Sequence, residues 1–305
     1  MSTMQHSEGN TRLQEQNLIM RNMPPQATFG DMTLPDTRLH YVKAGTGPPL
    51  IIVPATVSLI RQWLPLTQFM GQKFTSYFFE LPGHGGSTAY PEKFKSQFVP
   101  ETVEHFVNNL GYDKFNLMGF SFGGLLALRT LEHLQDRIDK VILLSPCVSR
   151  RALKWSTPRQ WAFKASIWAM KKQTLLHGIH YVMNAPRLEK PLTYALGKAS
   201  NVDRRILENK NALRMPLSTL DVFVYTLGEI FQTEYQYAGR FANACYFGMS
   251  VNDDILDYPL TEQIVRRHFQ RIMIQKFTHP YHQPPEPPTF EWLNREFGQF
   301  LGRIE

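Results

Sequence analysis

The sequence has few of the features that would place it outside ordinary globular proteins. Its 305 residues include only two cysteines, which excludes a disulfide scaffold and a cysteine-based zinc site. The longest apolar run, residues 50–60, is too short to cross a bilayer. The first 16 residues are polar and lack the apolar core of a secretory signal. We therefore expect a soluble, cytoplasmic protein.

Acidic residues are scarce in one segment of the chain. The composition as a whole, 43% hydrophobic and 19% charged with a net charge of +7, is typical of a globular protein. Residues 150–214, however, contain 14 Lys and Arg but only three acidic residues, a net charge of +11, so the rest of the chain carries −4. The positive balance thus belongs to one segment, and its meaning depends on where that segment lies in the fold.

Short apolar runs alternate with helical patterns along the first half of the chain. The runs, each typical of a strand buried on both faces, lie at residues 50–53, 76–81, 115–119 and 141–145. The helical patterns between them lie at residues 60–70, 100–110 and 125–134. This alternation predicts a doubly wound, mostly parallel sheet whose strands bring their carboxyl ends to one ligand-binding edge.

The alternation stops at Pro146 and resumes near residue 241. The residues between read as helices and loops, and strand and helix patterns then return up to a closing helix at residues 290–301. This predicts an α/β core with a helical cap inserted after the sixth strand. The expected parts are a flexible N-terminal tail (1–28), the first part of the core (29–147), the cap (148–240) and the second part of the core (241–305).

The sharpest motif is Gly119-Phe120-Ser121-Phe122-Gly123, a G-x-S-x-G sequence between a predicted strand and a predicted helix. In that context the serine sits on a sharp, strained turn, and glycine is needed two positions before and after it to avoid collisions. The turn lifts the Ser121 hydroxyl above the sheet edge. The Phe122 N–H, at the helix N-terminus, can donate to an oxyanion.

Together with residues 81–87, Leu-Pro-Gly-His-Gly-Gly-Ser, this motif resembles the α/β-hydrolase family, and the similarity covers about residues 38–147 and 241–303. The second motif resembles the family's turn after the fourth strand, where we assign His84 a packing role. The serine at the nucleophile position argues against the family's dehalogenases and epoxide hydrolases, which use aspartate there. The resemblance implies a serine esterase or lipase-like enzyme with a Ser–acid–His triad.

The acid of the triad is expected after the seventh strand. No Asp or Glu occurs between Asp139 and Glu189, so the loop after the sixth strand cannot supply it. The segment Asn252-Asp253-Asp254-Ile255 resembles the family's acid loop. The aliphatic Ile255, two positions after Asp253, favours Asp253 as the acid, and Asp254 is the alternative.

The histidine is expected shortly after the last strand, where His279 and His282 both lie. The family's G-H-x-x-H-E pattern favours His279 as the base, although Thr278 replaces its glycine. The spacing from His282 to the C-terminal helix fits slightly better, so His282 remains the alternative. An H-x-x-H pair without a third ligand predicts no metal site, and we expect no cofactor.

The second oxyanion donor is expected from the loop after the first buried strand. The family's His-Gly pair is absent from Val53-Pro54-Ala55-Thr56, and by position the Thr56 amide would serve. The sequence thus predicts hydrolysis of a carboxylic ester or related acyl bond in a small-molecule substrate. Carbon–carbon hydrolysis or acyl transfer by the same triad is the alternative, and a non-catalytic lipid- or nucleic-acid-binding protein is a more distant one.

The basic cap, which carries interleaved tryptophans, predicts attraction to an anionic substrate or an anionic membrane surface. The alternative is that the charge only keeps the solvent-exposed surface of the cap soluble. No nucleic-acid partner is expected, because no recognition motif accompanies the charge.

Overall fold

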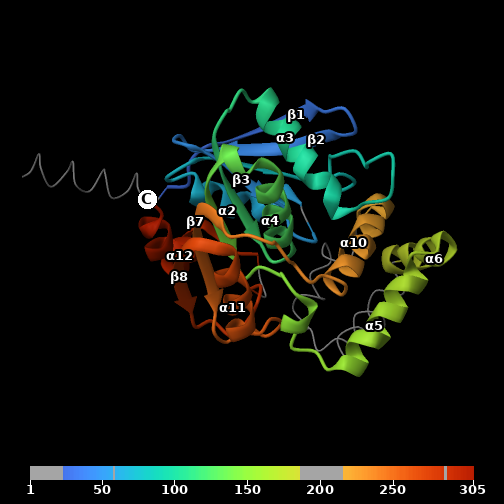
Figure 1. The fold of residues 1–305 in the computed structure, drawn as a ribbon. Helices are drawn as coiled ribbons and strands as arrows, with labels where there is room; N and C mark the ends of the chain where they lie inside the picture. Colours follow the sequence, from blue (N-terminus) through green and yellow to red (C-terminus); the bar gives the residue numbers. More distant parts are fainter. Residues whose placement is uncertain (1–22, 58, 186–215, 285–286) are drawn as a thin grey trace, which may run out of the picture.

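A computed structural model describes residues 23–57, 59–185, 216–284 and 287–305, and a single sheet runs through its centre (Figure 1). The eight strands are β1 (Ala27–Thr33), β2 (Arg38–Ala44), β3 (Pro49–Val53), β4 (Thr75–Phe79), β5 (Phe115–Phe120), β6 (Ile138–Leu144), β7 (Phe241–Ser250) and β8 (Phe269–Phe277). They are ordered β1-β2-β4-β3-β5-β6-β7-β8. β2 pairs antiparallel with both β1 and β4, and every other pairing is parallel.

The apolar strands are covered on both faces, as their continuous hydrophobic sequences predict. In β3, Leu50 and Ile52 pack into the core on one face while Ile51 and Val53 pack into the core on the other. On the first face lie α2 (Ile60–Met70) and α12 (Phe290–Arg303). The second face is covered by α3 (Val99–Asn109), α4 (Phe122–Leu134) and α11 (Tyr258–His268). The doubly wound α/β architecture expected from the sequence is therefore confirmed.

Residues 145–240 form an insertion between β6 and β7, and its described part is mostly helical. Its described elements are η3 (Arg150–Ala152), α5 (Thr157–Met170), α6 (Gln173–Asn184) and α10 (Leu217–Ile230); two further 3₁₀ turns elsewhere are η1 (Ser96–Phe98) and η2 (Gln135–Arg137). α10 lies between the sheet and the outer pair α5 and α6 (Figure 1). The insertion touches the core at loops that follow β4 and β7: Thr219 Oγ1 donates to the Gly83 carbonyl at 3.2 Å, and Leu153 bridges to Leu256.

Parts of the expected organisation fall outside these residues. Residues 1–22 of the predicted tail and residues 186–215 of the predicted cap are not described. β1 begins at Ala27, so the last two residues assigned to the tail belong to the sheet, where they pair with β2. Within the described ranges, no helix is long and apolar enough to cross a membrane.

Candidate active site

Ser121 lies on the turn between β5 and α4 with an unusual backbone conformation. Its φ of 53° and ψ of −122° are strained for a residue with a side chain. A Cβ atom on Gly119 would lie 2.2 Å from the Gly123 carbonyl oxygen, and one on Gly123 would lie 2.5 Å from the Val53 carbonyl oxygen. Glycine is thus required on both sides of the serine, as the motif predicts.

Backbone hydrogen bonds hold this strained turn against the end of β6. The Ser121 amide donates to the Leu144 carbonyl at 3.0 Å. The Ser121 carbonyl accepts from the amides of Gly124 and Cys147, both at 2.9 Å. The surrounding structure therefore fixes the serine in the conformation that presents its hydroxyl.

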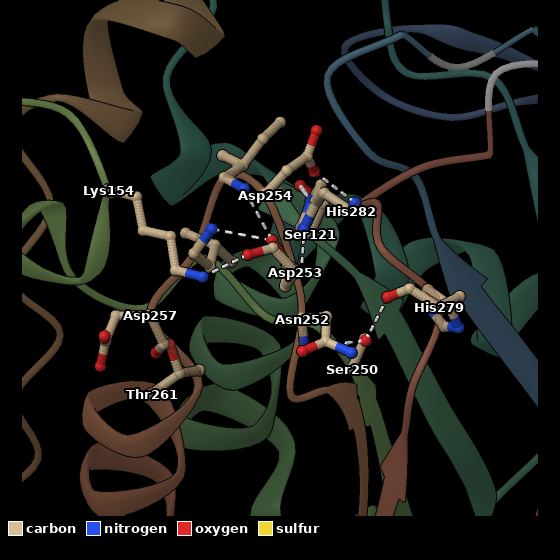
Figure 2. A network of polar contacts seen from close by, with 12 residues as sticks. Ser121, Lys154, Ser250, Asn252, Asp253, Asp254, Asp257, Thr261, His279 and His282 are labelled. Atoms are coloured by element: carbon tan, nitrogen blue, oxygen red, sulfur yellow. Dashed lines mark hydrogen bonds and ion pairs between the residues drawn. The ribbon is translucent and has the colours of Figure 1, made fainter.

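His282 is the histidine that reaches the serine (Figure 2). Its Nε2 lies 2.8 Å from Ser121 Oγ, and its ring stacks on Phe120 with centroids 5.2 Å apart. The residue is buried, with 7% of its surface exposed. The backbone amide of His282 donates to Asp254 Oδ1 at 2.6 Å, so the adjacent acid loop fixes where the residue sits.

Asp253 completes the hydrogen-bonded chain from the other side of the imidazole. It is fully buried, its Oδ2 lies 2.7 Å from His282 Nδ1, and its Oδ1 accepts the amides of Ile255 and Leu256. Burial acts to raise the pKa of Asp253, but the hydrogen bond and charge of His282 and the two amides outweigh it and lower the pKa. Because an ionised carboxylate only accepts, Nδ1 carries the proton and Nε2 is left to accept from the Ser121 hydroxyl.

The expectation that His279 is the base is wrong in this geometry. Its ring stacks between Phe277 and Tyr281, with centroids 5.8 Å and 4.8 Å away, and its carbonyl accepts a hydrogen bond from Ser250. Figure 2 shows it apart from the three residues of the chain. The loop after β8 needs three more residues to return to the β5–α4 turn that carries Ser121, here called the elbow, so the second histidine occupies the position that the family pattern favours for the first.

The alternatives for the acid are also separated. Asp253 enters the hydrogen-bonded chain, whereas Asp254 is exposed and binds the His282 backbone. From the sequence, Asp254 is only the alternative to Asp253 as the acid, and no separate role is predicted for it. No local pattern could have revealed one, because its partner lies 28 residues away.

The two residues expected to supply the oxyanion donors, Phe122 and Thr56, belong to segments next to the Ser121 turn. Phe122 is the first residue of α4, so its amide has no acceptor within the helix. The loop that contains Thr56 begins against the elbow, where the carbonyls of Val53 and Pro54 face Gly123. Both assignments remain predictions.

Lys154 is a neighbour of the site that sequence reasoning did not identify. From the start of the insertion, its Nζ donates to the Asp253 carbonyl at 2.5 Å and its amide donates to the Ile255 carbonyl at 2.8 Å. The insertion is therefore joined directly to the acid loop. The contact spans 99 residues of sequence and carries no sequence signal.

The turn after β4 packs under α10, as the packing role of His84 requires. The His84 side chain is fully buried, and burial lowers its pKa to about 4, an effect that the nearby Thr219 backbone offsets only in part. The Glu80 carboxylate secures the same turn by accepting the amides of Ile60 and Gly86. Among the described residues, no group of His, Cys, Asp and Glu is placed to hold a metal ion.

Comparisons with known proteins agree with this architecture. A family described as "alpha/beta hydrolase fold" matches residues 48–182. A soluble epoxide hydrolase from Corynebacterium sp. (strain C12) is 26% identical over 122 residues, 40% of this chain and 43% of the relative. An N-formylmaleamate deformylase from Pseudomonas putida is 28% identical over 134 residues, 42% of this chain and 50% of the relative. The chain thus spans about half the length of the curated relatives that it matches.

Solved structures match over a longer part of the chain. An alpha/beta fold family hydrolase from Bacillus anthracis str. Sterne superposes with a TM-score of 0.62 at 18% identity, covering 90% of this chain and 98% of that one. At this identity the likeness shows the fold alone.

Proposed function

Residues 48–182 match the α/β-hydrolase fold family, and from this premise we propose that the chain is a serine hydrolase that cleaves a carboxylic ester or a related acyl bond. The observation that carries the proposal is the continuous chain of hydrogen bonds from Ser121 through His282 to Asp253, at 2.8 Å and 2.7 Å. A serine hydroxyl is a weak nucleophile, and this arrangement supplies the base and the orienting carboxylate that it needs.

In the first half of the reaction, Ser121 Oγ attacks the substrate carbonyl while its proton passes to His282 Nε2. Asp253 holds the imidazole in the required tautomer and stabilises its charged form. The carbonyl oxygen becomes an oxyanion, which the Phe122 amide and a donor near Thr56 stabilise. When the intermediate collapses, the bond to the leaving group breaks and the leaving group takes the proton from His282. An acyl group remains on Ser121.

In the second half, His282 takes a proton from water as the water attacks the acyl carbonyl. The second tetrahedral intermediate expels Ser121 Oγ, which recovers its proton from His282, and the acid is released. Every proton moves among Ser121, His282, the leaving group and water. The mechanism therefore requires no metal or cofactor step.

Ser121 favours acyl chemistry over epoxide opening, the reaction for which the epoxide hydrolase relative is named. An acyl-enzyme on a serine is an ester that water can hydrolyse, whereas ring opening of an epoxide by a serine would leave a stable ether. The deformylase relative is named for removal of a formyl group, which is itself an acyl group.

A fluorophosphonate probe tests this function because it labels activated serines covalently. We expect wild-type protein to be labelled and Ser121→Ala to remain unlabelled. Ser166→Ala removes an exposed serine on α5 and should leave the labelling unchanged. Equal labelling of wild type and Ser121→Ala would contradict the proposal. A panel of esters graded by acyl length, with Ser121→Ala as the blank, then defines the substrate class.

A further inference from the structure

The outer helices of the insertion leave large apolar side chains in solvent. Trp161 and Trp168 on α5 are 68% and 66% exposed, and Tyr181 on α6 is 75% exposed. Each helix buries only one residue, Ile167 in α5 and Leu176 in α6. Two exposed tryptophans two turns apart on one helix are unusual in a globular protein and mark a surface that contacts something else.

The two tryptophans and Lys164 lie on one face of α5. Trp161, Lys164 and Trp168 are spaced by three and four residues, so they share one face of α5. Lys172, at the N-cap of α6, lies over the Trp168 ring, and the 43%-exposed Leu175 lies in the first turn of α6. We call these five residues, with Tyr181, the aromatic–basic face. α5 and α6 lie on the outside of the molecule, beyond α10 (Figure 1).

Each exposed tryptophan carries a lysine on its ring. Lys164 Nζ lies 5.5 Å from the ring centroid of Trp161, and Lys172 Nζ lies 4.8 Å from that of Trp168. No acidic residue occurs between Asp139 and Glu189, so neither helix has a carboxylate of its own to neutralise these cations. The face therefore combines apolar bulk with positive charge that no carboxylate of α5 or α6 offsets.

From this combination we propose that the aromatic–basic face docks on the surface of a bilayer that contains anionic phospholipid. Tryptophan and tyrosine favour the headgroup region, where their rings meet the acyl boundary and their polar atoms stay hydrated. Lysines beside them meet lipid phosphates and carboxylates. A nucleic acid would satisfy the cations but would leave Leu175 and the outward edges of the indoles in water.

The proposal goes beyond the hydrolase chemistry and does not depend on it, since none of the six residues belongs to the triad. Binding is therefore measured on Ser121→Ala as well as on wild type. Equal binding by the two proteins separates membrane docking from recognition of lipid as a substrate at the serine.

The test is co-sedimentation with phosphatidylcholine vesicles prepared with and without phosphatidylserine. We expect wild type to bind the anionic vesicles, to bind the neutral ones at least tenfold more weakly, and to be released from anionic vesicles by salt. Each lysine near an anionic surface contributes about a fivefold change in partition, so Lys164→Gln with Lys172→Gln should weaken binding roughly 20- to 30-fold. Trp161→Ser with Trp168→Ser should weaken it at least as much.

The matched control is Lys114→Gln with Lys140→Gln, at the amino ends of β5 and β6 on the opposite edge of the sheet. It removes the same charge and should leave vesicle binding unchanged. Thermal melting of each variant should match wild type, because the altered side chains are at the surface. Failure of wild type to bind anionic vesicles, equal binding to neutral vesicles at low salt, or an equal loss in the control pair would overturn the proposal.

Discussion

The loops at the carboxyl edge of the sheet and the outer helices of the insertion are built in opposite ways. In the loops, polar side chains are buried and paired: Asp253 is fully buried, and both of its oxygens accept hydrogen bonds. On α5 and α6, large apolar side chains such as Trp161 are exposed and nearly nothing is buried. Each region thus reverses the usual relation between side-chain chemistry and burial.

The difference separates two functions within one chain. Burial and multiple hydrogen bonds hold a few groups at fixed distances, which proton transfer requires. Exposed aromatic and basic side chains do nothing for such geometry but suit contact with a broad surface. Lys154 connects the two regions, because it lies at the start of the insertion and donates a hydrogen bond to the acid loop.

The largest expected contrast in stability comes from truncating one aromatic residue in each region. Phe247 in β7 is fully buried, so Phe247→Ala should lower the free energy of unfolding by about 3–5 kcal/mol. Trp161→Ala removes a larger side chain that is 68% exposed and should change the free energy by less than about 0.5 kcal/mol. Urea unfolding measures both values. Similar losses for the two variants would show that α5 is packed as a core helix.

Buried His84, in the turn after β4, should make the stability of the folded protein depend on pH. Its folded pKa of about 4 lies below the ordinary value of 6.5. Below pH 6.5 the unfolded chain therefore binds a proton that the folded chain does not, and stability falls as the pH drops toward 4. The loss attributable to His84 by pH 4 is about 3 kcal/mol. His84→Leu should remove that part of the pH dependence, whereas parallel stability curves for wild type and variant would contradict it.

A smaller effect is expected where Asp254 holds the backbone of His282. Asp254→Ala removes the acceptor of the 2.6 Å hydrogen bond and should lower kcat/KM by about tenfold, because the histidine is positioned less well. Asp254→Asn retains a carbonyl acceptor at the same place and should stay within about threefold of wild type. Equal losses in the two variants would indicate that the charge, and not the hydrogen bond, is what matters.

The sequence predicted the parts of the molecule that depend on local pattern. Buried strands such as residues 50–53 are recognisable because apolar residues must cover both faces of a parallel sheet. The elbow at Ser121 is recognisable because its turn leaves room only for Gly119 and Gly123. Asp253 was favoured by the aliphatic residue two positions later, and it is the acid in the hydrogen-bonded chain.

What the sequence did not predict depends on the path of loops in space. The choice between His279 and His282 turned on how far the chain travels after β8 before it meets the elbow, which spacing alone does not determine. The contact of Lys154 with the acid loop joins segments 99 residues apart. The basic character of residues 150–214 was visible, but the side of α5 that faces solvent follows from its packing against α10.

The most direct test of the account compares alanine variants of the two histidines in hydrolysis of the best ester substrate. His282 lies 2.8 Å from Ser121 Oγ, so His282→Ala should lower kcat by about 10⁴-fold or more. His279→Ala should retain kcat within about tenfold, since its ring stacks on Phe277 and Tyr281 and lies apart from Ser121 (Figure 2). A large loss for His279→Ala with activity preserved in His282→Ala would contradict the assignment of the triad.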